Sequence, residues 1–139
     1  METIVGTIII KENKVLMVKE AKKKCYSKWA FPAGHLEKDE TILEGAKRET
    51  LEETGCKVEL EKTFPILIGN IKDKNIMMIH FLANLVEDNL LYNTDEIIET
   101  KWIDIEQIKN MKEEEFRSYP VVKSIIENLE KQNLYDLNI

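Results

Sequence analysis

The sequence has little cysteine or proline and no long apolar run, and each shortage excludes a class of protein. Two cysteines in 139 residues exclude a disulfide-stapled scaffold, and they form no recognisable zinc spacing with the two histidines. Three prolines form no linker, and the chain has no internal repeat or low-complexity stretch. No apolar run is long enough to cross a membrane, and the first ten residues lack the basic segment and cleavage site of a signal peptide. We therefore expect one domain over residues 1–139, in the cytoplasm and without a membrane partner.

The charge is also one-sided, with a formal net value of −6. A protein that binds duplex nucleic acid usually carries a basic face, so we expect no nucleic-acid duplex as partner. A local exception is a group of lysines that either attracts a phosphate-bearing substrate or is simply a solvated loop. Both interpretations stay open for its members, Lys19, Lys22, Lys23, Lys24 and Lys28.

Strand-like and helix-like patterns alternate along the chain. A capping box at Thr41 and Glu44 predicts a helix over 41–54 that ends at Gly55. A stripe of Leu43, Ala46 and Thr50 would dock this helix on a sheet. The other predicted elements are strands at 3–10, 15–19, 58–68 (broken near Pro65), 76–86 and 102–103, an acidic loop at 87–99, and an amphipathic helix marked by Val122, Ile125, Ile126 and Leu129. This alternation predicts an α/β (α+β) fold in which helices cover a mixed sheet.

The predicted helix concentrates carboxylates on one face. Glu49, Glu52 and Glu53 stand at positions i, i+3 and i+4, where like charges destabilise a helix and an external cation would relieve them. Arg48 lies beside Glu52 and can also reach Glu40, so it could hold the glutamates in position. The alternative is an ordinary solvated acidic face.

The run from Gly34 to Gly55, GHLEKDETILEGAKRETLEETG, resembles the Nudix box, G-x5-E-x7-R-E-U-x-E-E-x-G-U, where U is a bulky apolar residue. Seven specified positions match, Thr50 takes a U position that is usually aliphatic, and Pro-Ala-Gly replaces the frequent Pro-Gly-Gly. The resemblance implies the Nudix α/β/α sandwich with a mixed central sheet. It also implies a metal-dependent enzyme that hydrolyses a diphosphate linkage by attack of water on phosphorus.

The same resemblance implies a set of site residues. Glu49, Glu52, Glu53 and the Gly34 carbonyl would bind Mg²⁺, for which Mn²⁺ could substitute, and Arg48 would position the glutamates. An acid in a later loop often completes such sites. Here Glu96 is the first candidate for that catalytic and metal-binding role and Glu99 the second, unless the loop is merely solvated. His35 is interpreted as a loop residue and His80 as a packed strand residue.

The substrate is less well defined. Residues 32–37, Pro-Ala-Gly-His-Leu-Glu, together with Arg117 and Ser118, look most like a small bacterial branch. That branch acts on nucleoside di- and triphosphates and on the diphosphate of a thiamine precursor. A small nucleotide or organic diphosphate is therefore the expected partner, for a monomer or a homodimer. Two alternatives stay open: an inactive binding module and a prenyl-diphosphate isomerase on the same fold. The additional catalytic cysteine of such isomerases has no clear counterpart here, but the presence of Cys25 does not allow the isomerase to be excluded.

Overall fold

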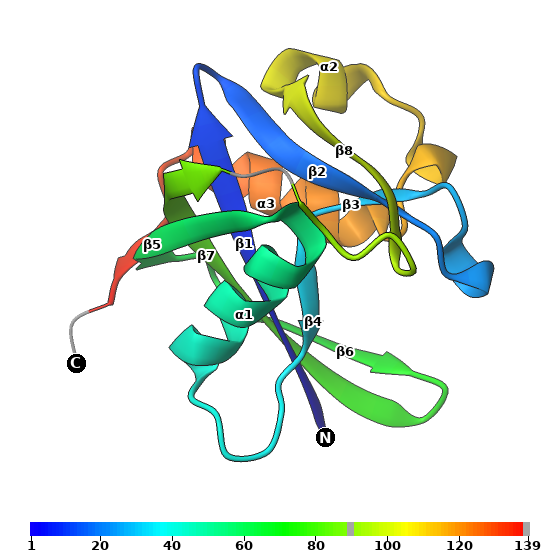
Figure 1. Cartoon of the computed structure of the whole chain (residues 1–139), viewed down its shortest axis with the longest axis vertical. Coiled ribbons are helices and arrows are strands. Elements are labelled where there is room, and N and C mark those ends of the chain that lie inside the picture. The colour runs from blue at the N-terminus through cyan, green and yellow to red at the C-terminus, as the bar shows by residue number, and fades with distance from the viewer. Residues whose placement is uncertain (89–90, 138–139) are drawn as a thin grey trace.

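The computed structural model describes residues 1–88 and 91–137, which form a strongly bent sheet with helices on both sides (Figure 1). The order of its elements is β1 (Glu2–Lys11), β2 (Lys14–Glu20), the short 3-10 turn η1 (Lys23–Cys25), β3 (Trp29–Ala30), β4 (Ala33–His35), α1 (Ile42–Thr54), β5 (Cys56–Thr63), β6 (Leu67–Ile71), β7 (Lys74–Asp88), β8 (Ile97–Asp104), α2 (Ile105–Asn110), η2 (Glu113–Glu115), α3 (Tyr119–Glu130) and β9 (Tyr135–Asp136).

The sheet is mixed, as predicted. β1 runs parallel to β7, from Glu2 opposite Ile76 to Ile9 opposite Ala83, while the other named strand pairs are antiparallel. The strand order is β3-β2-β1-β7-β5-β9, with β4 paired to β1, β6 to β7 and β8 to β2. β4 pairs with the first half of β1, whereas β2 pairs only with its last two residues. The chain between β2 and α1 therefore passes from the end of β1 that pairs with β2 to the end that pairs with β4.

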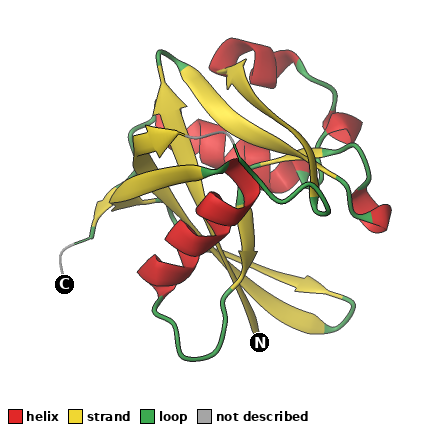
Figure 2. Cartoon of the chain, viewed as in Figure 1, coloured by secondary structure: helices red, strands yellow, loops and turns green. Residues whose placement is uncertain are grey.

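Alternate residues of β1 and β7 supply the hydrophobic clusters on the two faces of the sheet. Val5 packs in a cluster with Ala46 of α1 and with Ile79. Ile8 belongs to a second cluster that includes Ile125 of α3. The alternation follows from the two-residue period of a strand. α1 and α3 consequently lie on opposite faces of the sheet, which confirms the α/β/α sandwich (Figure 2).

The docking face of α1 differs in part from the predicted stripe. Leu43 is 43% exposed, while Ala46 and Thr50 are fully buried. The Thr50 hydroxyl oxygen lies 2.6 Å from that of Thr7 on β1, and it also lies 2.7 Å from the Ala46 carbonyl. A hydroxyl at this position therefore fixes α1 to β1 by hydrogen bonds as well as by packing. Gly45 leaves room for two neighbours, because a Cβ there would approach the ends of the Leu36 and Glu40 side chains to 2.7 and 2.9 Å.

The structure corrects two loop predictions, because segments predicted as loops belong partly to strands. β7 continues to Asp88 and β8 begins at Ile97, which is fully buried, so the predicted acidic loop at 87–99 is a strand at both of its ends. His35 belongs to β4, opposite Ile4, rather than to a loop. His80 is 2% exposed in β7, as predicted. No helix among residues 1–88 and 91–137 is long and apolar enough to cross a membrane.

Candidate active site

The two ends of α1 form as the sequence predicts, and they set the direction of its carboxylates. The Thr41 hydroxyl accepts a hydrogen bond from the Glu44 N–H, and the Glu44 carboxylate accepts one from the Thr41 N–H, both at 3.1 Å. Gly55 ends the helix in the left-handed conformation, with φ of 71°. These caps fix the helix register, so the glutamates of its last two turns face the same region.

The three glutamates lie in different environments. Glu53 is 2% exposed and Glu49 is 8% exposed, whereas about half of the Glu52 side chain is exposed. Burial, with smaller contributions from Glu20, Glu49 and Glu96, raises the pKa of Glu53 to about 8. Burial likewise raises the pKa of Glu49. Nearby carboxylates disfavour each other's ionised forms, and a cation favours them.

The strand β4 provides the other wall of the site. The Ala33 N–H donates a hydrogen bond of 3.0 Å to Glu53 Oε1. The next residue, Gly34, lies against Glu49 so closely that a Cβ there would overlap the Glu49 carboxylate. Only a residue without a side chain fits between β4 and that carboxylate, which brings the main chain of β4 to the predicted ligands.

Arg48 binds the surrounding carboxylates, as expected from its position. Its Nε and Nη2 donate to the two oxygens of Glu40, at 2.9 and 2.8 Å. Its Nη1 donates to Glu49 at 2.9 Å and to Glu52 at 3.3 Å. This guanidinium lowers the pKa of Glu40 to about 2. Arg48 therefore holds two of the three helix glutamates from the solvent side, while Glu53 lies behind them.

Glu96 is brought to this cluster from the turn that precedes β8. The Ala21 N–H donates to the Glu96 carbonyl at 2.8 Å, which ties the turn to the end of β2. The Glu96 charge contributes to the raised pKa of both Glu49 and Glu53. Glu99 is instead exposed on β8, opposite Lys19, and is not among the main causes of either shift. The geometry thus favours Glu96 over Glu99 as the loop acid.

The sequence analysis missed Glu20 at the end of β2. Its side chain is 3% exposed, Arg117 Nη1 donates to its Oε1 at 3.1 Å, and its charge contributes to the raised pKa of Glu53. One signal was present: Glu20 is an acid that ends an apolar strand, Lys14–Glu20, at a position where the side chain is buried. A buried carboxylate is uncommon and calls for a partner.

The donor set fits a divalent cation of the Mg²⁺ or Mn²⁺ type. It offers carboxylate oxygens and main-chain carbonyls, which these ions prefer to thiolates and imidazoles. Among residues 1–88 and 91–137, no three acidic, histidine or cysteine side chains gather closely enough to hold a metal ion by themselves. The site would therefore supply some of the ligands of a cation, and Mg²⁺ commonly takes the others from water and substrate phosphates.

The loop that carries the lysine group lies beside this cluster, and two of the five lysines make contacts within the protein. The loop after β2 returns to Glu20, because the Glu20 N–H donates to the Lys28 carbonyl and the Ser27 N–H to the Glu20 carbonyl. Lys28 donates to the Glu114 carbonyl, and the Lys19 ammonium lies 5.5 Å from the Trp29 ring centroid. Lys22, Lys23 and Lys24 are exposed.

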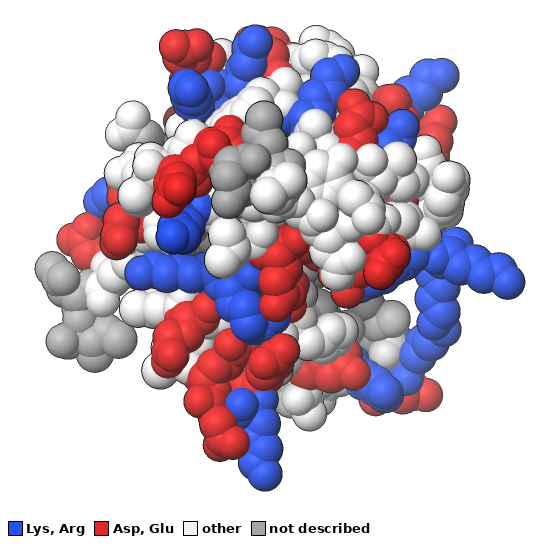
Figure 3. Space-filling view, in the orientation of Figure 1, with Lys and Arg blue, Asp and Glu red and all other residues white. Residues whose placement is uncertain are grey.

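Figure 3 shows acidic side chains gathered over α1.

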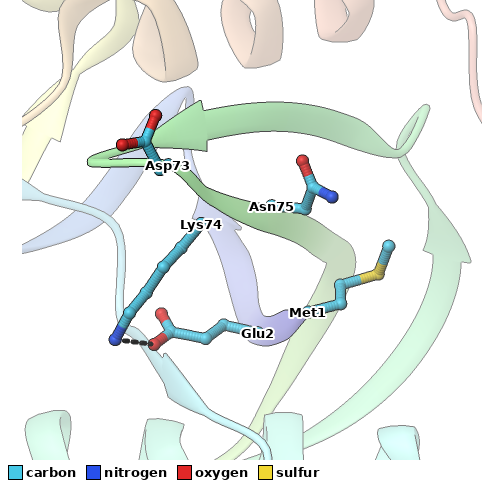
Figure 4. A pocket seen from close by; sticks show the side chains of 5 residues that line it. All are labelled: Met1, Glu2, Asp73, Lys74 and Asn75. Atoms are coloured by element: carbon cyan, nitrogen blue, oxygen red, sulfur yellow. Dashed lines mark ion pairs between the residues drawn. The ribbon is translucent and has the colours of Figure 1, made fainter.

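A separate hollow lies beside the start of β1. Met1 and Glu2 line it together with residues 73–75 of the β6–β7 turn, around a volume of about 400 Å³ (Figure 4). Lys74 and Glu2 form an ion pair of 3.6 Å across it. It shares no residue with the carboxylate cluster, so it is not part of the candidate active site.

Comparison with known proteins places these features in one family. The profile of the NUDIX domain matches residues 2–125, and the chain therefore belongs to the NUDIX family. This confirms the resemblance seen in the sequence. The chain is 34% identical over 107 residues to an 8-oxo-dGDP phosphatase of Danio rerio, covering 73% of this chain and 31% of that protein. It is 31% identical over 125 residues to an RNA pyrophosphohydrolase of Pelagibacter ubique, covering 77% of this chain and 78% of that protein.

A solved structure agrees with this assignment. A NUDIX hydrolase of Nitrosomonas europaea superposes with a TM-score of 0.88 at 28% identity, over 98% of this chain and 93% of that chain. The chain spans less than a third of the length of several curated relatives that it matches. The family generally uses divalent metal cations.

Proposed function

We propose that this chain is a hydrolase of phosphoric anhydrides that acts on a nucleoside di- or triphosphate or a related small organic diphosphate. The cofactor would be Mg²⁺, with Mn²⁺ as a substitute. The observation that carries the proposal is the pairing of Glu49 and Glu53 on α1 with the main chain of Ala33 and Gly34 on β4. Two buried acids held against the main chain of Ala33 and Gly34 form a polar wall at which a charged diphosphate and its cation can meet.

The roles of the residues follow from their environments. Glu49, Glu52, Glu53, Glu96 and the Gly34 carbonyl would hold the cation. The cation would neutralise phosphate oxygens and lower the pKa of its bound water. Arg48 would keep Glu49 and Glu52 in place through the hydrogen bonds described above.

A proton acceptor for the attacking water is also required. A carboxylate held in a fixed orientation beside the attacking water can accept its proton. Glu53 is buried against β4, and the Ala33 N–H fixes the orientation of its carboxylate. We therefore propose Glu53 as the general base, with Glu96 as the alternative from the loop. Water would attack phosphorus, its proton would pass to the carboxylate, and a phosphate or nucleotide would leave.

The nucleotide class of substrate is supported by the relatives, whose names specify 8-oxo-dGDP and RNA pyrophosphate as substrates. The acidic surface and the net charge of −6 give no support to a long nucleic-acid duplex as substrate. The intact set of acids argues against an inactive binding module. A cytoplasmic location and a monomer or homodimer stay predictions.

The decisive experiment measures the release of phosphate and pyrophosphate from a panel of nucleotides and organic diphosphates in the presence of Mg²⁺. Nucleoside di- and triphosphates, a prenyl diphosphate and a dinucleoside polyphosphate belong in the panel. We expect hydrolysis of at least one nucleotide, which EDTA abolishes and Glu53→Gln strongly reduces. Isomerised prenyl diphosphate without hydrolysis would identify the isomerase instead. Binding without turnover would identify the inactive module.

A further inference from the structure

Glu20 has one carboxylate oxygen satisfied and one that is not. Arg117 Nη1 donates to Oε1 at 3.1 Å, whereas Oε2 is buried and has no hydrogen-bond partner among the described residues. Leaving a buried polar group unpaired costs about 1–3 kcal/mol, and more for a charged one. A buried acceptor without a partner calls for a specific explanation, such as an ion that it binds.

The position of Glu20 points to the same region as the box glutamates. Its charge acts on Glu53, together with those of Glu49 and Glu96. The pairing of β2 with β8 is irregular between Lys19 and Glu20, where the strand reaches the turn that carries Glu96. Glu20 therefore approaches the cluster from β2, on a different side from α1.

The charges around this cluster do not balance. Glu20, Glu49 and Glu96 all lie close enough to Glu53 for their charges to act on it, and the charge of Glu96 also acts on Glu49. Arg48 already binds Glu40, Glu49 and Glu52. Arg117 contacts Glu20 with a single nitrogen, and nearly half of its side chain is exposed. A divalent cation would supply the missing positive charge and a partner for Oε2.

We propose that Glu20 is an additional ligand of the divalent cation, through its Oε2, and that Arg117 is the positioning residue that holds the Glu20 carboxylate toward the site. The proposal rests on the proposed function, since it adds a residue outside the box to the same cation site. A purely structural role would be different: Glu20 would only fasten Arg117 and the start of α3 to β2. The Arg117 main-chain N–H already makes such an attachment, to the Trp29 carbonyl at 2.9 Å.

The test measures Mn²⁺ binding to the full chain without substrate, by the electron paramagnetic resonance signal of free Mn²⁺. Glu20→Gln keeps the size of the side chain and an acceptor for Arg117 but removes the charge. Glu20→Asp keeps the charge and withdraws the oxygen by one methylene. We expect each variant to weaken Mn²⁺ binding by about tenfold or more, the scale seen when groups around a metal are altered. Glu61→Gln, an exposed acid on β5, is the matched control and should keep wild-type affinity.

Variants of Arg117 provide a second, independent test of the proposal. Arg117→Ala should weaken Mn²⁺ binding, and Arg117→Lys should restore part of it, because a lysine can still hold the carboxylate. Each protein is titrated at a temperature at which circular dichroism shows it folded. Wild-type Mn²⁺ affinity in both Glu20 variants would overturn the proposal, and wild-type affinity in Arg117→Ala would remove Arg117 from it. Wild-type turnover of a nucleotide alongside unchanged affinity of the Glu20 variants would reject this inference alone, whereas a wild type without hydrolysis would reject the proposed function.

Discussion

The carboxylate of Glu49 fills the volume that a side chain at Gly34 would occupy. A residue of β4 and a residue of α1 are thus in direct contact at the centre of the site. The contact explains why the glycine is required at the start of the box, since its φ is not positive and no turn demands it. It also makes Gly34 a position where a single methyl group should disturb the predicted ligands without disturbing the core.

The first prediction follows from this contact. In Gly34→Ala, the new Cβ should displace the Glu49 carboxylate, which is the flexible end of a side chain, so we expect a folded protein with weakened Mn²⁺ binding and lower turnover. The measurements are circular dichroism, Mn²⁺ titration and phosphate release. Gly69→Ala on β6 is the control, because a Cβ there meets nothing within 4 Å. Equal Mn²⁺ affinity in the two variants would contradict a role for the Gly34–Glu49 contact.

The second prediction concerns cation binding and stability. An ion that binds only the folded state stabilises it, by about 2.7 kcal/mol at a concentration of 100 times its dissociation constant. We therefore expect millimolar Mg²⁺ to raise the thermal midpoint of the wild type above its value in EDTA. The gain should be smaller in Glu49→Gln, in which one buried carboxylate of the cluster is neutral. An unchanged wild-type midpoint, together with activity that survives EDTA, would refute the cation site.

The third prediction concerns Glu53→Gln. Removal of the proposed base should lower turnover by at least about a hundredfold. In EDTA, by contrast, the free energy of unfolding of Glu53→Gln should exceed that of the wild type. The folded pKa of Glu53 is raised from 4.5 to about 8, so its contribution to stability is present below 4.5 and is lost as the pH rises to about 8.

Glutamine does not titrate, so the variant should become more stable than the wild type across that interval, by up to about 1.4 kcal/mol per pH unit. Urea unfolding at several pH values in EDTA measures the difference. A difference that does not depend on pH would show that the Glu53 carboxyl is not held in an environment that disfavours its charge.

The fourth prediction separates the two acids near β8. Glu96 influences Glu49 and Glu53, whereas Glu99 is exposed on β8 opposite Lys19. Glu96→Gln should therefore lower the rate more than Glu99→Gln and shift the Mg²⁺ dependence to higher concentration. Steady-state kinetics over a Mg²⁺ series compares them directly. A larger defect in Glu99→Gln would reverse the assignment, and two harmless variants would place the base within the box.

The fifth prediction concerns His80, which lies outside the site. Burial lowers its pKa from 6.5 to about 4, and its Nδ1 has no hydrogen-bond partner among the described residues. As the pH falls from 6.5 to 4, the unfolded chain gains a proton that the folded protein does not take up. The free energy of unfolding should therefore fall over that interval.

His80→Phe should make this pH dependence shallower, because a phenyl ring does not titrate and can still contact Phe31. His35→Gln, at an exposed position on β4, is the control and should keep most of the wild-type slope. Chemical denaturation between pH 4 and 7 compares the slopes rather than the absolute stabilities. Equal slopes in the wild type and His80→Phe would contradict the prediction.

The sequence by itself determined the features that depend on local spacing. The capping box of Thr41 and Glu44, the end of α1 at Gly55 and the shared face of Glu49, Glu52 and Glu53 all follow from 3.6 residues per turn. The family follows from the same run, because its motif is contiguous. The pairing of Arg48 with Glu40 was also within reach, eight residues apart.

Only the tertiary structure decided which acids meet. Glu20 and Arg117 are 97 residues apart, and their pairing depends on how β2, β3 and the start of α3 come together. The resemblance already ranked Glu96 before Glu99, but the contact of Glu96 with the cluster depends on where β8 begins, and no local pattern marked that boundary. The difference in burial between Glu52 and Glu53, adjacent on one helix, depends on β4 covering only one of them. Local spacing places side chains on a face, but burial and charge coupling arise from the elements that pack against that face.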